Sequence, residues 1–312
     1  MLIGNRIHKV RIVRTSGSDR RIVDVNRQRR RSTSLGNSAA RHILLLCVAF
    51  LSFVLATRSN AIGGTVIGQA TTSKAVRAMA IRDIPFKGLT PEARSRISAV
   101  VSKPTMYRRM PISVLDADPE LLQFLIRQPE VVVNIWQLMG ITKVSANRIG
   151  PYTLNATDGI GTQSKVELVY GTPDTHLIFC EGDYEGPLFR KPLRGRCVLL
   201  LKTGKSKAED GGWKVSNRLD VFLQVDHLGV GALTKTFHPL MGKSADINFL
   251  ESMKFLERLS QTAEKNGKGM ERLAHRLDKV DATSREKFAK LSLKVYEQNR
   301  NRLANIPGKG SM

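Results

Sequence analysis

The sequence is poor in the features that define several large protein classes. Its 312 residues include three cysteines and 6% aromatic side chains, which excludes a small scaffold held together by many disulfides. No Gly-X-Y period occurs, and no repeat of roughly 20–50 residues, so collagen-like and solenoid folds are excluded. Hydrophobic residues nevertheless make up 41% of the chain, a fraction that is enough for a folded core.

Acidic residues are scarce relative to basic ones. The chain has 50 Lys and Arg residues against 27 Asp and Glu, a net charge of +23. The net charge is +10 over residues 1–61, +5 over 62–104, +2 over 105–263 and +6 over 264–312. Because the most foldable segment carries little of this excess, and because no zinc-finger, RNP or basic-zipper pattern occurs, the sequence does not predict a nucleic-acid partner.

A long apolar run is also missing. The longest, residues 43–56, has 14 residues and falls short of the ~20 that a bilayer-spanning helix needs. It follows the basic run 29–31 and precedes small residues that end at Ala61, the pattern of a secretory signal peptide. We therefore expect a signal peptide over residues 1–61, cleavage before Ile62, and export to the periplasm or cell envelope. The alternative is an uncleaved inner-membrane anchor formed by the apolar run.

Two cysteines remain after this cleavage. Cys180 and Cys197 fall on neighbouring predicted strands. In an oxidising compartment they either form a disulfide or stay as two buried thiols that behave as small hydrophobic side chains.

The segment 62–104 is predicted to be a leader with one short helix. Residues 62–88 are rich in Gly, Ala and Thr, with scattered basic residues, which is typical of a flexible connection. Residues 90–92 supply a hydroxyl N-cap, a proline at the first helical position and an acid in the first turn. A helix is therefore expected over residues 90–101.

Residues 105–266 are predicted to form an α+β domain. After a short strand at 111–115, Asp118 and Pro129 each begin a helix. From residue 141 the apolar residues recur at every second position, which predicts antiparallel strands. The six strands expected there span residues 142–149, 151–158, 163–170, 175–183, 195–203 and 214–226. Their alternation of apolar and largely polar residues predicts a sheet covered on one face.

A long helix over residues 244–266 is expected to cover that face of a sheet of six to seven strands. Its apolar residues recur at three-residue steps, namely Ile247, Leu250, Met253, Leu256 and Leu259. The segment 267–312 is predicted to be a separate basic helical tail. Its apolar stripe comprises Met270, Leu273, Leu277, Val280, Phe288 and Leu291. An apolar side on an otherwise basic helix is typical of a helix lying on an anionic membrane surface, here through residues 268–312.

The order of these elements resembles the START-like, or helix-grip, superfamily of polyketide cyclases and lipid-transfer proteins. The resemblance covers residues 112–115, the helical pair 118–140, the strands from 141 to 226 and the helix 244–266. It implies a long helix closing a curved sheet around an apolar tunnel for a lipid, sterol or aromatic ligand. The residues expected to line this tunnel are Trp136, Leu168, Tyr170, Val221, Leu223, Leu250 and Met253.

Motifs for catalysis or metal binding are missing. No phosphate-binding glycine loop, HExxH, CxxC or Gly-x-Ser-x-Gly pattern occurs, so the sequence predicts no cofactor and no metal and favours a non-enzymatic protein. Glu181, Asp183 and Glu185 alternate onto one strand face, where they either lie in solvent, hold a cation or meet basic residues on the next strand. Those basic residues are Arg190, Lys191, Arg194 and Arg196.

Three functions are compatible with these observations. The first is a cell-envelope module that binds a lipid or other apolar small molecule without catalysis. The alternative is a structural or interaction protein with a packed core, whose basic tail docks on an anionic membrane or envelope polymer. The third, a cavity enzyme, needs inward polar groups, and the predicted strand faces supply few. A cavity of several hundred Å³ between the sheet and the helix 244–266 would distinguish the first from the second.

Overall fold

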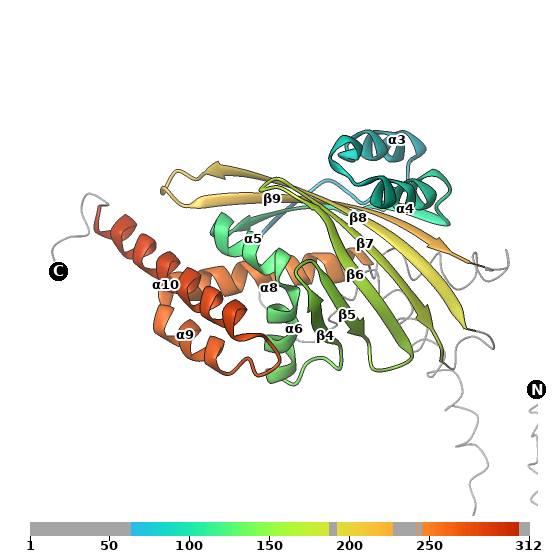
Figure 1. The fold of residues 1–312 in the computed structure, drawn as a ribbon. Helices are drawn as coiled ribbons and strands as arrows, with labels where there is room; N and C mark the ends of the chain where they lie inside the picture. The colour runs from blue at the N-terminus through green and yellow to red at the C-terminus, as the bar shows by residue number, and fades with distance from the viewer. Residues whose placement is uncertain (1–63, 187–191, 227–241, 243–244, 306–312) are drawn as a thin grey trace, which may run out of the picture. The chain divides into compact units, whose positions relative to one another are not determined.

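The computed structural model describes residues 64–186, 192–226, 242 and 245–305 (Figure 1). The predicted signal peptide, its cleavage site between Ala61 and Ile62 and the alternative anchor at 43–56 lie outside these residues. Of the helices that are described, none is both long and apolar enough to cross a membrane.

The fold is α+β and is built on one antiparallel sheet, with nine strands in the described part of the chain. The strands are β1 Thr65–Ile67, β2 Met106–Arg109, β3 Ile112–Asp116, β4 Ser145–Gly150, β5 Thr153–Thr157, β6 Thr162–Gly171, β7 Thr175–Tyr184, β8 Leu193–Lys207 and β9 Trp213–Val225. Their order is β1-β3-β9-β8-β7-β6-β5-β4, and β2 also pairs with β9. The expected count of six to seven strands is too low because β1 and β2, of three and four residues, are too short to show a two-residue period.

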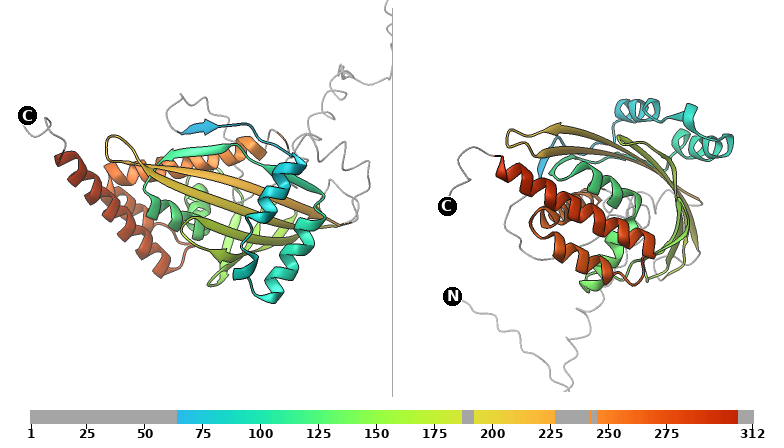
Figure 2. Two further views of the ribbon diagram at one scale, coloured as in Figure 1. Left: turned by 90° about the horizontal axis from the view of Figure 1, so that it is seen from above. Right: turned by 60° about the vertical axis from the view of Figure 1, so that its left-hand side comes forward.

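Five of the described helices lie on the inner side of the curved sheet (Figures 1 and 2). They are α5 Pro119–Arg127, α6 Pro129–Leu138, α8 Ala245–Lys265, α9 Gly267–His275 and α10 Ala282–Ala304. As predicted, Asp118 caps α5, and its carboxylate accepts from the backbone N–H groups of Glu120 and Leu121. The buried side chains of these helices and of the inner sheet face form the main core.

The outer face of the sheet is covered too, which corrects the prediction of a sheet covered on one side. The covering elements are α3 Lys74–Arg82, the short 3-10 helix η2 Phe86–Gly88 and α4 Pro91–Ser102 (Figure 2). Ile97 of α4 packs with Phe179 and Phe222 of the sheet in a second core. Because this contact buries large apolar side chains, the segment from residue 64 to 104 belongs to the domain and is not a flexible leader.

A β-bulge in β6 turns Tyr170 to the outer face. Leu168 and Tyr170 are predicted to share the inner face, but the pairing of β6 with β7 shifts its register between them. Val169 and Tyr170 therefore both pack against the outer core, and a Cβ on Gly88 would lie 2.7 Å from the Tyr170 ring. Tyr170 does not line an inner cavity, because one extra residue in a strand reverses the face of those that follow.

The buried side of α8 differs from the predicted stripe at its start. Met253, Leu256 and Leu259 are buried as expected and Leu250 is half-buried, but Ile247 is 46% exposed. Ile247 lies nine residues before Leu256, which at about 3.6 residues a turn places the two on opposite sides of the helix. A strict three-residue step cannot stay on one face over this length.

The described part of the segment 267–312 is not a separate tail. Its predicted apolar stripe packs in the main core. The rings of Phe124 on α5 and Phe288 on α10 stack with their centroids 6.1 Å apart, and Lys294 forms an ion pair with Glu120 at 2.5 Å. The apolar side expected to meet a membrane is therefore occupied by the rest of the domain.

Candidate functional site

A small apolar cavity lies between α8 and the sheet. Its volume is about 70 Å³, well below the ~300–1,000 Å³ that is usual for a ligand pocket. Of the predicted lining residues, Trp136 and Met253 border this cavity. Val221 and Leu223 are buried in the main core, and Leu250 packs against that core.

A second cavity, of about 210 Å³, opens beside the C-terminal end of α5. Its apolar wall is made by Ile126, Pro129, Leu154, Val166, Leu168 and Ile178. Its polar wall is made by Arg127, Gln128, Arg148, Tyr152 and Lys287. Leu168, predicted to line a tunnel, lies here. The combination of buried apolar side chains with exposed polar ones at the opening is what an amphiphilic ligand requires.

A third space, a cleft of about 400 Å³, adjoins the other two at Ile126. Polar side chains, among them Gln123 and His176, line much of it. Ile126 borders all three spaces, and Ile178 borders the first two. Both isoleucines are only half-buried, although they lie between the sheet and the helices. The side chain of Ile126 is thus a wall that the three spaces share.

Arg127 and His176 meet where the second cavity and the cleft adjoin. Arg127 Nε donates to His176 Nε2 at 3.0 Å, so the neutral ring carries its proton on Nδ1. Burial lowers the pKa of His176 to about 4, and the positive charge of Arg127 acts in the same direction. His176 is therefore neutral near pH 7.

Arg127 has no carboxylate partner among the described residues. Its other contacts are the Thr172 carbonyl oxygen at 3.0 Å and, in the amide orientation that satisfies both groups, the Gln123 side-chain oxygen at 2.8 Å. All partners of this half-buried guanidinium are neutral, so none of them offsets its charge.

The other two cations of the second cavity differ from each other. Arg148 is held by both oxygens of the buried Glu130, at 2.6 and 2.8 Å, which compensates its charge. Lys287 is exposed, and the ion pairs of α10 are made by its neighbours Lys290, Lys294 and Arg302. Among the residues that the structure describes, the charges at this cavity that lack compensation are therefore those of Arg127 and Lys287.

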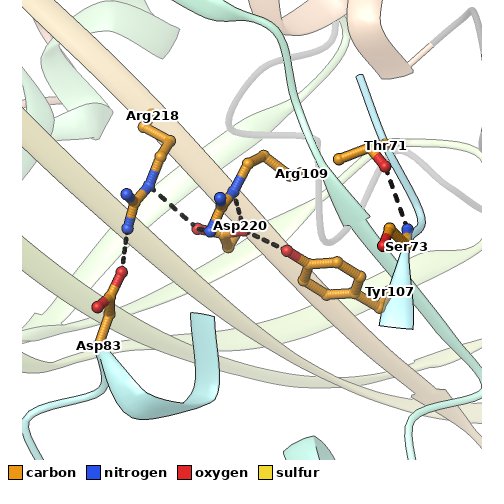
Figure 3. Close-up of polar contacts among 7 residues, drawn as sticks. All are labelled: Thr71, Ser73, Asp83, Tyr107, Arg109, Arg218 and Asp220. Carbon is orange, nitrogen blue, oxygen red and sulfur yellow. Dashed lines mark hydrogen bonds and ion pairs between the residues drawn. The ribbon is translucent and has the colours of Figure 1, made fainter. Parts of the chain in front are cut away.

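A buried charged cluster lies on the outer face, beside α3 (Figure 3). Asp220 is 0% exposed and accepts from the Tyr107 hydroxyl at 2.6 Å and from Arg109 Nε at 2.8 Å. Arg218 pairs with Asp220 and with Asp83, at the end of α3. Burial, together with the hydrogen bond to Asp220, raises the pKa of Tyr107. Because Asp220 is fully partnered and the cluster joins α3 to β2 and β9, its role is structural.

Of the predicted acidic row on β7, Asp183 pairs with a basic residue on β8. Glu181 lies opposite Arg196 and Asp183 lies opposite Arg194, and the Asp183 and Arg194 side chains are 3.1 Å apart. Arg190 and Lys191 lie outside the described residues. Within the described ranges, no group of three or more His, Cys, Asp or Glu side chains is placed to hold a metal ion.

The two cysteines of the domain are neighbours in the same ladder. Cys180 of β7 and Cys197 of β8 are directly opposite each other, and both are buried. The hairpin on which their proximity was predicted is therefore present, and their side chains face the main core.

Comparison with known protein families and with curated proteins finds no match to this chain. The candidate site therefore rests on its own geometry. Sequence reasoning missed Ile126, Arg127 and Lys287. The first two end an apolar helix, where a basic residue is expected in any case because of the helix dipole, and Lys287 reaches the cavity only through the packing of α10 on α5.

Proposed function

We propose that the chain is a non-enzymatic module that binds a small apolar molecule between the inner face of the sheet and the helices α5 and α6. The observation that carries this proposal is the 210 Å³ cavity, whose apolar wall continues through Ile126 and Ile178 into the 70 Å³ cavity. A cavity of about 150 Å³ already holds a molecule of the size of benzene. The space therefore suits a small ligand or a single short chain.

This proposal moves the ligand away from the place that the START-like resemblance implies. With about 70 Å³ beneath it, α8 borders the smaller cavity and does not cover a wide tunnel. The order of β3, α5, α6, the six strands β4 to β9 and then α8 supports a helix-grip relationship as part of the same proposal. Residues 1–61 support export of the module to the cell envelope.

A second candidate is a structural or interaction protein with a packed core. The small volume under α8 and the burial of the α9–α10 stripe favour it. In that case the 210 Å³ cavity is a packing defect, and an anionic partner would meet the basic outer side of α9 and α10. Exposed basic residues in α9 and in the segment between α9 and α10 include Lys268, Arg272, Arg276 and Lys279.

Native mass spectrometry of the full chain, purified from its natural source, distinguishes the two candidates. Ligand binding predicts a bound apolar species in the parent protein. The variant Leu168→Trp, which fills the apolar wall, should lack this species. Ile149→Trp makes a similar change at an exposed strand position outside the cavity and should keep it. If each of the three proteins showed only the mass of its own bare chain, the packed-core protein would be favoured.

A further inference from the structure

We infer that the ligand of the 210 Å³ cavity carries a carboxylate, which Arg127 and Lys287 bind at the polar end of the cavity. The inference rests on the proposed function, since it names the ligand class of the same site. Among the described residues, three cations and no carboxylate line this cavity. Because Glu130 compensates Arg148, two positive charges remain for a ligand.

Arg127 is oriented for such a contact by neutral groups. The His176 ring nitrogen and the Thr172 carbonyl oxygen fix its guanidinium, each at 3.0 Å. A guanidinium has five N–H donors, and these contacts together with Gln123 leave at least one on Nη1 for an incoming oxygen. A carboxylate bound beside apolar side chains is stabilised more strongly by this charge than it would be in water.

Lys287 brings the second charge from the other end of the chain. The stacking of Phe288 on Phe124 seats α10 against α5, which places the neighbouring Lys287 at the cavity. Since Lys290 and Lys294 are paired with Glu286 and Glu120, Lys287 is the lysine of this helix that a ligand at the opening would meet.

The apolar wall of the cavity determines the chemistry of the rest of the ligand. Leu154 and Val166 are buried at the base of the cavity, and Leu168, Ile126 and Ile178 are half-buried along it. Tyr152 and Lys287 are exposed at the opening. A short acyl or aromatic carboxylic acid has the matching arrangement, with an apolar body and one anionic end.

The inference is tested with three ligands of equal chain length, octanoate, 1-octanol and octylamine, titrated calorimetrically into the full chain. Octanoate should bind roughly tenfold tighter than 1-octanol, because a hydrogen bond to a charged group replaces a neutral one. Octylamine should bind most weakly. The preference for octanoate should shrink as the salt concentration rises.

Amino-acid substitutions show which residues cause the preference for octanoate over 1-octanol. Lys287→Gln should weaken octanoate binding about two- to fivefold and leave 1-octanol binding unchanged. Lys279→Gln makes the same charge change at an exposed position that does not line the cavity, and should change neither. Arg127→Gln should remove the preference for octanoate, and Arg127→Lys should restore part of it. If Arg127→Gln does not fold, the Lys287 and Lys279 pair still decides the question.

A failure of the carboxylate inference and a failure of the proposed function would give different results. Equal binding of octanoate and 1-octanol by the parent chain would keep the proposed function and overturn the carboxylate. Equal losses in Lys287→Gln and Lys279→Gln would also overturn it, because they would show a general effect of net charge. Binding of none of the three ligands would overturn the proposed function itself.

Discussion

Two buried ionisable residues, Asp220 and His176, each lie against arginine side chains. Asp220 lies between Arg109 and Arg218 and pairs with both. His176 lies against Arg127 and the core and is held neutral. The ion pairs of Asp220 join α3 to the sheet. The hydrogen bond to neutral His176, by contrast, leaves the Arg127 guanidinium without an anion.

Replacing Asp220 by Ala should lower the free energy of unfolding by about 3–5 kcal/mol, the usual cost of removing one partner of a buried ion pair. The Tyr107 hydroxyl and Arg109 would lose their shared acceptor. Asp183→Ala is the matched control, since that carboxylate is 57% exposed and an exposed pair contributes about 0–1 kcal/mol. Urea unfolding followed by circular dichroism measures both. Similar losses in the two variants would contradict the structural role of Asp220.

His176 should stay neutral until the pH approaches 4. Because its pKa is lowered from 6.5 to about 4, the unfolded chain binds this proton first. The stability contributed by His176 is therefore complete above pH 6.5 and is lost as the pH falls from 6.5 through 4, by up to about 3 kcal/mol. Imidazole NMR titration measures the pKa, and His176→Gln should remove this part of the pH dependence. A pKa of 6 or more would contradict the burial of the ring.

Helices and strands were predictable where their apolar period is long. The strands from β4 to β9 and the helices α4, α5, α6 and α8 follow the predicted ranges to within a few residues. The elements that were missed are short or polar. β2 carries Arg108 and Arg109, whose side chains form ion pairs. α3 has a single buried residue, Ala80. Tertiary contacts stabilise these elements, and the local periodicity of the sequence does not reveal such contacts.

The corrected face of α8 yields a test within one helix. Leu256→Ala should lower the free energy of unfolding by about 2–5 kcal/mol, because it truncates a core side chain. Ile247→Ala, at a position that is 46% exposed, should change it by less than about 0.5 kcal/mol. Thermal or urea unfolding measures both. A large loss in Ile247→Ala would show that the predicted three-residue stripe, and not the observed face, packs on the domain.

At the scale of the whole molecule, the described residues form one sheet that helices cover on both faces, and the C-terminal helices are part of the inner core. Alternation along the strands and helical spacing predicted the inner side for Leu168, Trp136 and Met253, and these side chains border the inner cavities. The charged half of the site was not predictable, because Arg127 and Lys287 come together only when α10 packs on α5.

Truncation tests this view of the C-terminal segment. Deletion of residues 268–312 should destabilise or unfold the domain, because it removes Phe288, Leu291 and Val295 from the main core. The single variant Phe288→Ala should already cost about 3–5 kcal/mol. Circular dichroism and urea unfolding report both. A truncated chain with the stability of the parent would restore the separate tail that the sequence predicts.

The central claim is that an apolar ligand enters between the sheet and the helices α5 and α6. Methyl NMR of the isotopically labelled chain, titrated with uncharged 1-octanol, tests it directly. The account predicts that the methyl signals of Ile126, Leu168 and Ile178 shift together and saturate, while those of the exposed Ile149 and Ile247 do not move. Shifts confined to exposed methyl groups, or no shift at all, would contradict it.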